Sequence, residues 1–164
     1  MEFLLHTSEE DKRAMTLSQQ ALSLFMHSAL ALGSWLALML IGYVLNPPSV
    51  PQPVILVLSA LVPAVAGFLI ARTRRDEMAL FVWLVGLIWI LVISLWILDL
   101  PTGPNACLQC DATEKLSRTL LSLPKPSGLI DNDGPFLGTW PAAALIGYSI
   151  GAKLAQRRRP KSIE

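Results

Sequence analysis

Four long apolar runs, separated by short polar segments, restrict the fold of this chain more than any other feature. They cover about residues 21–45, 53–71, 78–100 and 135–154. A hydrocarbon layer about 30 Å thick needs roughly 20 apolar residues as a helix, because lipid offers exposed backbone N–H and C=O groups no hydrogen-bond partner. Only 15% of the residues are charged, against about 25% in soluble domains. We therefore predict an all-α, polytopic integral membrane protein with four transmembrane helices.

The positions of the basic residues orient these predicted helices. Ten of the thirteen Lys and Arg residues lie in residues 1–20, in the second connection or after residue 152. An even number of spans puts these segments on one side, and the positive-inside rule makes that side the cytoplasm. Both termini are then cytoplasmic, and the long third loop, residues 101–134, faces outward. Three aromatic residues fall at the expected outer ends, where we predict that they anchor the helices at the headgroups: Tyr43, Trp96 and Trp140.

These boundaries predict one membrane domain between two cytoplasmic ends. We expect a cytoplasmic N-terminal segment over residues 1–20, a single four-helix membrane domain over 21–154 and a basic tail over 155–164. Acidic residues at positions 9–11 argue against a cleavable signal peptide. We predict an integral protein of the bacterial cytoplasmic (inner) membrane, with the lipid bilayer as its first partner.

The outward loop has the pattern of a short amphipathic helix. Asp111 and Glu114 resemble a capping box. Apolar residues follow with helical spacing at Leu116, Leu120 and Leu123. We expect this helix to lie on the outer membrane surface and to end before Pro124.

The only cysteines, Cys107 and Cys110, form a C-x-x-C motif just before that helix. A local disulfide is one interpretation, since the outward side of a bacterial inner membrane is oxidising. A redox-active dithiol is another, because a helix N-terminus stabilises a thiolate, and Cys107 benefits most if Asn105 caps the helix. A zinc site shared by two chains and a pair of unlinked thiols also stay open. Asp111 stands where a c-type haem would need a histidine, which excludes that cofactor.

In span number and in this C-x-x-C motif, the chain resembles membrane thiol oxidases of the disulfide-bond B and vitamin K epoxide reductase type. Those families use a second cysteine pair to relay electrons from a partner, and this chain has only Cys107 and Cys110. The resemblance covers one tetrapeptide, so we assign no family from it.

Small residues spaced four apart mark the faces along which membrane helices pack closely. Such faces occur in three predicted spans: Ala29, Gly33 and Ala37 in the first, Ala60 and Ala64 in the second, and Ala143, Gly147 and Gly151 in the fourth. We interpret these faces as packing within one bundle. The alternative is self-association or contact with a membrane protein partner.

The spans contain few polar side chains. His27, about two turns into the first span, and Asp99, at the outer end of the third, form a candidate intramembrane polar site. A histidine in a span serves either as a hydrogen-bonded packing residue or as a contact for a proton or a quinone. Pro63 in the second span is likewise either an ordinary membrane-helix proline or a gating kink.

The functional hypothesis rests mainly on exclusion. The chain has no G-x-G-x-x-G, P-loop, H-E-x-x-H or G-x-S-x-G motif, and its net charge of +1 offers nucleic acid no basic surface. We identify no catalytic residue, no metal ligand set and no cofactor. Our leading hypothesis is a non-enzymatic accessory or assembly subunit that acts through helix packing and its outward loop. The alternatives are a membrane thiol–disulfide oxidoreductase using Cys107 and Cys110, and a small oligomeric transporter.

Overall fold

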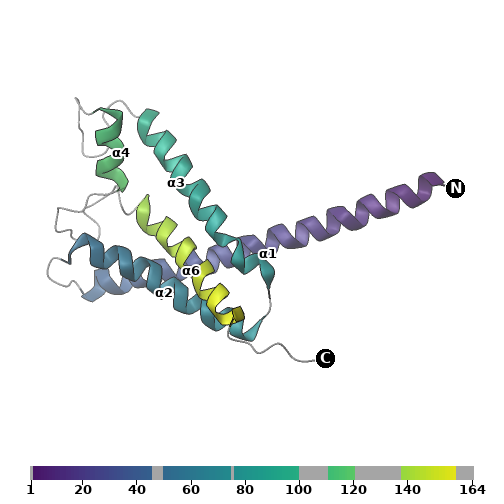
Figure 1. The fold of residues 1–164 in the computed structure, drawn as a ribbon, viewed down its shortest axis with the longest axis horizontal. Helices are drawn as coiled ribbons and strands as arrows, with labels where there is room; N and C mark the ends of the chain where they lie inside the picture. Colours follow the sequence, from purple (N-terminus) through teal and green to yellow (C-terminus); the bar gives the residue numbers. More distant parts are fainter. Residues whose placement is uncertain (1, 46–49, 75, 100–110, 121–137, 158–164) are drawn as a thin grey trace.

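The computed structural model describes residues 2–45, 50–74, 76–99, 111–120 and 138–157, leaving aside the side chains of residues 2–15, 52, 118 and 119. Within these ranges the chain is helical and contains no β-strand, which confirms the all-α class (Figure 1). The described helices are, in chain order, α1 (Glu2–Leu45), α2 (Gln52–Thr73), the 3-10 helix η1 (Glu77–Leu80), α3 (Val82–Asp99), α4 (Ala112–Leu120) and α6 (Thr139–Arg157).

Three of the described helices are long and apolar enough to cross a membrane. They are Thr16–Leu45 within α1, Pro53–Thr73 within α2, and the whole of α3. The first three apolar runs of the sequence are therefore confirmed as candidate spans. α6 contains residues 139–154 of the fourth run but is not one of the three, and its glycines and Lys153 dilute its apolar side chains.

The third candidate span begins later than residue 78. Asp76 caps η1 by accepting a hydrogen bond from the Met78 amide at 2.9 Å, and α3 starts only at Val82. An aspartate favours this cap position because its side chain satisfies a free N–H at the helix start. α1 is one continuous helix from Glu2 to Leu45, so it runs from the predicted N-terminal segment into the first span without a break.

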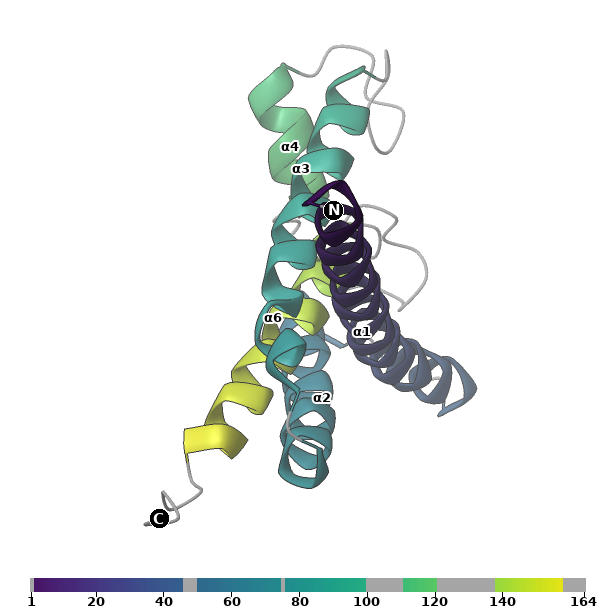
Figure 2. The same ribbon diagram turned by 90° about the vertical axis from the view of Figure 1, so that its right-hand side faces the viewer.

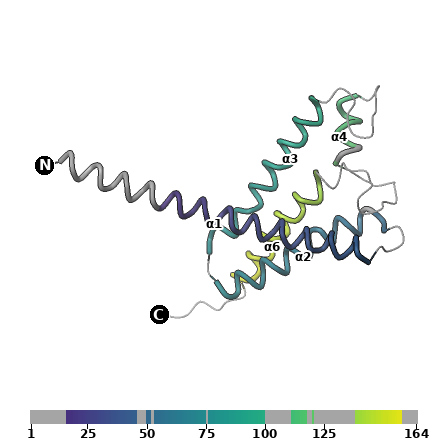
Figure 3. The backbone as a smooth tube through the Cα atoms, turned by 180° about the vertical axis from the view of Figure 1, so that it is seen from behind, coloured from purple at the N-terminus to yellow at the C-terminus, as the bar shows by residue number. Residues whose placement is uncertain are grey.

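α6 is the most enclosed of the described helices. Trp140, Leu145 and Tyr148 are at most 1% exposed along it. α6 packs chiefly against α2 and α3, and Figures 1 and 3 show it between them. The burial of Trp140 makes the prediction of a headgroup anchor at this position wrong, because the ring packs inside the bundle. Tyr43 and Trp96, by contrast, are exposed.

Backbone atoms of α2 and α6 approach each other closely at small residues. A Cβ built on Gly147 would stand 2.8 Å from the carbonyl carbon of Ala60, and a Cβ on Gly151 would stand 2.6 Å from the carbonyl carbon of Ala64. Real Cβ atoms essentially never come this close to a backbone atom, so only the hydrogen of glycine fits at these two positions. This is the small-residue packing by which helices associate in lipid.

A glycine of α2 also allows close approach to α6, and a glycine of α3 makes a looser approach to α6. A Cβ on Gly67 of α2 would stand 3.0 Å from the carbonyl carbon of Tyr148. A Cβ on Gly86 of α3 would stand 3.2 Å from the carbonyl oxygen of Ala142, which is tight but not excluded. The helices α2 and α6 therefore form the closest pair of the bundle.

α1 contacts the bundle through larger side chains on one face. Ala31, Trp35 and Met39 repeat every four residues and are at most 7% exposed. Trp35 and Met39 belong to one buried cluster with Ile55 of α2 and Trp140 of α6. In Figure 2, α1 lies to one side of the other helices.

α4 lies where the sequence pattern predicts a short helix. The carbonyl of Asp111 accepts a hydrogen bond from the Lys115 amide at 2.9 Å, which places Asp111 at the start of the helix. The hydroxyl of Thr139 donates to the carbonyl of Leu120 at 2.5 Å and so joins the end of α4 to the beginning of α6. Leu123 lies outside the described residues, and the position of α4 on an outer membrane surface stays a prediction.

Candidate functional site

Four polar side chains meet at the end of the bundle where α2 ends and α3 begins. Ser23 and His27 come from α1, Asp76 comes from the connection between α2 and η1, and Tyr148 comes from α6. We call these four residues the Asp76 cluster. A spacing of four residues puts Ser23 and His27 on one face of α1. The cluster therefore joins elements whose contacting residues lie 49 to 121 positions apart.

His27 is the centre of the Asp76 cluster. Its Nδ1 lies 2.7 Å from the Tyr148 hydroxyl, and its Nε2 lies 3.2 Å from Oδ2 of Asp76. A carboxylate only accepts hydrogen bonds, so Nε2 carries a proton. In the neutral imidazole Nδ1 then accepts from the Tyr148 hydroxyl, whereas in the charged imidazole Nδ1 donates to it. The hydroxyl can take both roles, so the geometry accommodates His27 with one proton or two.

Asp76 is held by donors from several elements. The Ser23 hydroxyl donates to Oδ2, the Met78 amide donates to Oδ1 at 2.9 Å, and the side-chain amide of Gln156 donates to the backbone carbonyl at 3.5 Å. Burial raises the pKa of the Asp76 carboxyl, but the hydrogen bonds that the carboxylate accepts outweigh burial. The pKa of Asp76 therefore lies below its ordinary value of 3.8, and the residue is negatively charged at neutral pH.

A polar pocket of about 310 Å³ opens beside the cluster. α1 contributes Thr16, Gln19 and Gln20 to its wall, and Ser23 and Asp76 border it as well. These last two residues therefore face both the pocket and the buried His27. In chemical terms the cluster can share hydrogen bonds among His27, Asp76 and Tyr148 and tie α1 to the rest of the bundle.

The structure does not bring His27 and Asp99 together. Asp99 ends α3 and is exposed. The 18 residues of α3 correspond to about 27 Å at a rise of 1.5 Å per residue, and they separate Asp99 from the Asp76 cluster. The polar partners of His27 are Asp76 and Tyr148 instead.

The predicted helix-packing residues fall into two groups. Gly147 and Gly151 contact the backbone of α2, and Ala143, one turn earlier, is half-buried. Gly33 and Ala37 are exposed on α1, and a Cβ built on Gly33 has no atom within 4 Å. Among the described residues, the small-residue face of α1 is therefore not a contact of the bundle.

The structure does not test the two interpretations of the cysteine pair. Cys107 and Cys110 lie outside the described residues, so both the disulfide and the redox interpretations stay predictions. The helix after them begins at Ala112, with Asp111 rather than Asn105 before it.

Pro63 is fully buried, and α2 continues through it.

Sequence reasoning missed Asp76 and Tyr148. Asp76 stands in a run of charges that is typical of an interfacial connection, and Tyr148 stands in the weakest apolar run. A signal was available on α1, because Ser23 and His27 share a face near the end of the first span that the positive-inside pattern predicts on the same side as that connection. Two polar side chains on one helix face predict a polar partner there, although they do not identify it.

Comparisons with known proteins add no relative. No protein-family model matches the chain, and neither a curated protein nor a solved structure was found to be similar. Within the described ranges, no three His, Cys, Asp or Glu side chains are grouped so as to hold a metal ion. The helical fold and the three apolar helices define the class of the protein, an all-helical integral membrane protein.

Proposed function

We propose that this protein is a non-enzymatic accessory or assembly subunit of a membrane complex. Its partner would place a transmembrane helix on the exposed small-residue face of α1, which we define by Ala29, Gly33 and Ala37. The observation that carries the proposal is the open space at Gly33, where an added Cβ would meet no atom within 4 Å. In the α2–α6 pair, Gly147 and Gly151 both lie against backbone.

The contrast between these glycines supports a partner because glycine has a cost in a helix. It is less favourable than alanine by about 1 kcal/mol in water, and its advantage in lipid is that a second backbone can approach it. Exposed Leu36 and Leu40 follow Gly33 and Ala37 by three residues. They provide larger side chains beside the small ones, against which a second helix would pack.

We further propose that α6 is the fourth span and that both termini are cytoplasmic, in a bacterial inner membrane. α6 packs along α2 and α3, which are both apolar and long enough to cross. A helix covered by protein needs less hydropathy than one covered by lipid. The basic residues Arg72 and Arg157 end α2 and α6, and Gln156 reaches the Asp76 carbonyl, so these ends lie at one level.

Photo-crosslinking in native membranes tests the partner face. A photoreactive phenylalanine analogue is placed at residue 29, 33 or 37 in turn, with Val92 and Leu95 as control positions because both are more than half exposed on α3. We expect one membrane polypeptide to be captured from the α1 positions and not from α3. In a second arm, Gly33→Leu should convert the complex to the free chain in native electrophoresis while the purified chain keeps its thermal stability.

Three outcomes would contradict this proposal. If every position gave only lipid adducts, the claim that a protein partner binds α1 would be wrong. If the complex survived Gly33→Leu, the partner would not bind at this face of α1. Capture of only a second copy of the chain would replace the accessory role with self-association.

The topology is tested with a fusion reporter that works only in the cytoplasm, attached after residue 164. An active reporter supports four spans, and an inactive but membrane-inserted fusion contradicts them.

A further inference from the structure

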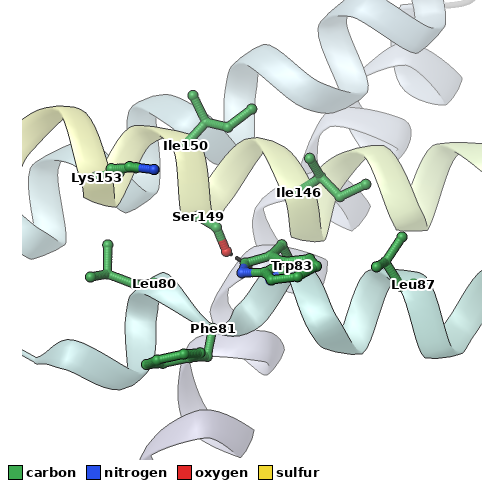
Figure 4. A pocket seen from close by; sticks show the side chains of 8 residues that line it. All are labelled: Leu80, Phe81, Trp83, Leu87, Ile146, Ser149, Ile150 and Lys153. Carbon is green, nitrogen blue, oxygen red and sulfur yellow. Dashed lines mark hydrogen bonds between the residues drawn. The ribbon is translucent and has the colours of Figure 1, made fainter.

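We propose that an apolar groove between α3 and α6 binds one anionic phospholipid, with an acyl chain along the groove and the phosphate beside Lys153. The groove has a volume of about 460 Å³. Its walls include Leu80, Phe81, Trp83 and Leu87 on one side and Ile146 and Ile150 on the other (Figure 4). This inference goes beyond the proposed function and does not depend on it, since the partner face lies on α1.

The groove opens toward the surroundings of the bundle. Phe81, Leu87 and Ile150 are 45%, 47% and 53% exposed although they line it. α3, which contributes Trp83 and Leu87 to the groove, is strongly apolar and is a candidate membrane span. A ligand in this groove therefore enters sideways from the bilayer.

The only hydroxyl in the lining is already satisfied by the protein. Ser149 accepts a hydrogen bond from the backbone amide of Trp83 at 2.8 Å and donates to the carbonyl of Leu145 at 3.4 Å. Apart from the indole N–H of Trp83, the side chains that line the groove between its ends therefore offer a ligand apolar surface rather than hydrogen bonds. That chemistry suits a hydrocarbon chain, which would lose affinity beside an unpaired polar group.

Lys153 gives the groove a charged end. Figure 4 shows Lys153 near Leu80 at one end and Leu87 toward the other. Lys153 is exposed, and the structure assigns it no ion pair within the described ranges. Gln156, less than one turn further along α6, reaches the Asp76 carbonyl, so Lys153 lies near the level at which α2 ends. A lysine at the depth of the headgroups attracts the phosphate of an anionic lipid.

The two chemically different parts of the groove favour a phospholipid as the occupant. Its walls are apolar, and its one cation, Lys153, stands at one end, which matches the acyl chain and the phosphate of an anionic lipid. An acyl chain is narrow enough to follow the apolar walls while its headgroup stays beside Lys153.

Native mass spectrometry of the full-length chain in a non-ionic detergent tests the site. The probes are dioleoyl phosphatidylglycerol and dioleoyl phosphatidylcholine, which differ in headgroup charge, with glycerol phosphate as the headgroup without chains. We expect one retained phosphatidylglycerol, bound about fivefold more tightly than phosphatidylcholine. Lys153→Gln should remove that preference, while Arg72→Gln, also an exposed cation at a helix end, should keep it. Ile146→Trp, which fills the groove, should weaken both lipids.

The same data can overturn the inference. Equal retention of the two phospholipids by the unaltered chain would remove the role of charge. If Lys153→Gln kept the preference for phosphatidylglycerol, or if Arg72→Gln lost it to the same extent, the lipid would not be bound in this groove. Displacement of the bound lipid by glycerol phosphate at matched concentration would show that the acyl chain contributes nothing. Lys153→Gln changes an exposed side chain, so the test does not depend on whether Ile146→Trp folds.

Discussion

The contact between α2 and α6 and the contact between α1 and the bundle are built on different principles. Across α2 and α6, Gly147 and Gly151 allow two backbones to touch. α1 is held by large side chains such as Trp35 and Met39, and by the Asp76 cluster at one end. The comparison teaches that glycine four residues from another small residue has two meanings in this chain. On α6 the space beside the glycine is occupied by the backbone of α2, and on α1 the space beside Gly33 is open.

The physical basis of the difference is how closely the backbones approach each other at the glycines. Close backbone approach gives many dispersion contacts and weak Cα–H···O contacts, which hold helices together in lipid without any hydrophobic gain. α1 has no such contact at Gly33, where an added Cβ would meet no atom within 4 Å. Its position then depends more on directional hydrogen bonds, and those of α1 include the bonds that Ser23 and His27 make to Asp76 and Tyr148.

The largest expected effect is at the close contact. Gly151→Ala places a methyl group against the backbone of Ala64, and we expect it to lower the free energy of unfolding by about 3 kcal/mol or more, at the upper end of overpacking costs. Gly33→Ala is the matched change on α1, and we expect no loss of stability from it, because the position is open and alanine is the better helix former. Unfolding of the purified chain by added denaturing detergent measures both. Equal effects would break the comparison.

A smaller effect is expected from the hydrogen bond between His27 and Tyr148. In a double-mutant cycle with His27→Leu and Tyr148→Phe, we expect a coupling energy of about 1 kcal/mol, within the range of hydrogen bonds between membrane helices. Ser34 donates locally to the carbonyl of Ala31 in α1, so Ser34→Ala paired with Tyr148→Phe should be additive. Zero coupling for the first pair would mean that the Asp76 cluster does not hold α1.

The smallest effect concerns acid. Because the pKa of Asp76 is lowered in the folded chain below 3.8, its charge contributes stability above that value, and the contribution is lost as pH falls through the folded pKa. The advantage of the unaltered chain over Asp76→Asn should therefore be present at neutral pH and shrink below about pH 4. Unfolding midpoints measured from pH 7 to pH 3 check this. Glu77→Gln, an exposed neighbour, is the control, and an equally pH-dependent difference for it would contradict the role of Asp76.

Much of the fold could be predicted from residues alone. The lengths of the first three apolar runs predict the candidate spans, and Asp111 predicts the start of α4. The site was predicted only in part. His27 was identified as an unusual residue, but its partner Tyr148 lies 121 positions away and appears in the sequence as one more residue of an apolar run. No local pattern carries that pairing.

Residue chemistry and the thickness of a bilayer were sufficient to define the class of protein, because the cost of exposing backbone groups to lipid acts on each segment separately. Which face of each helix turns inward is not determined in this way, because it depends on the neighbouring helix. In lipid an apolar side chain is equally suited to the inside and the outside of a bundle, so the pattern of α1 does not distinguish the buried Trp35 from the exposed Gly33. That choice was made by packing: α6 fits against α2 at its glycines, and α1 is then placed by its large side chains and its hydrogen bonds to Asp76 and Tyr148.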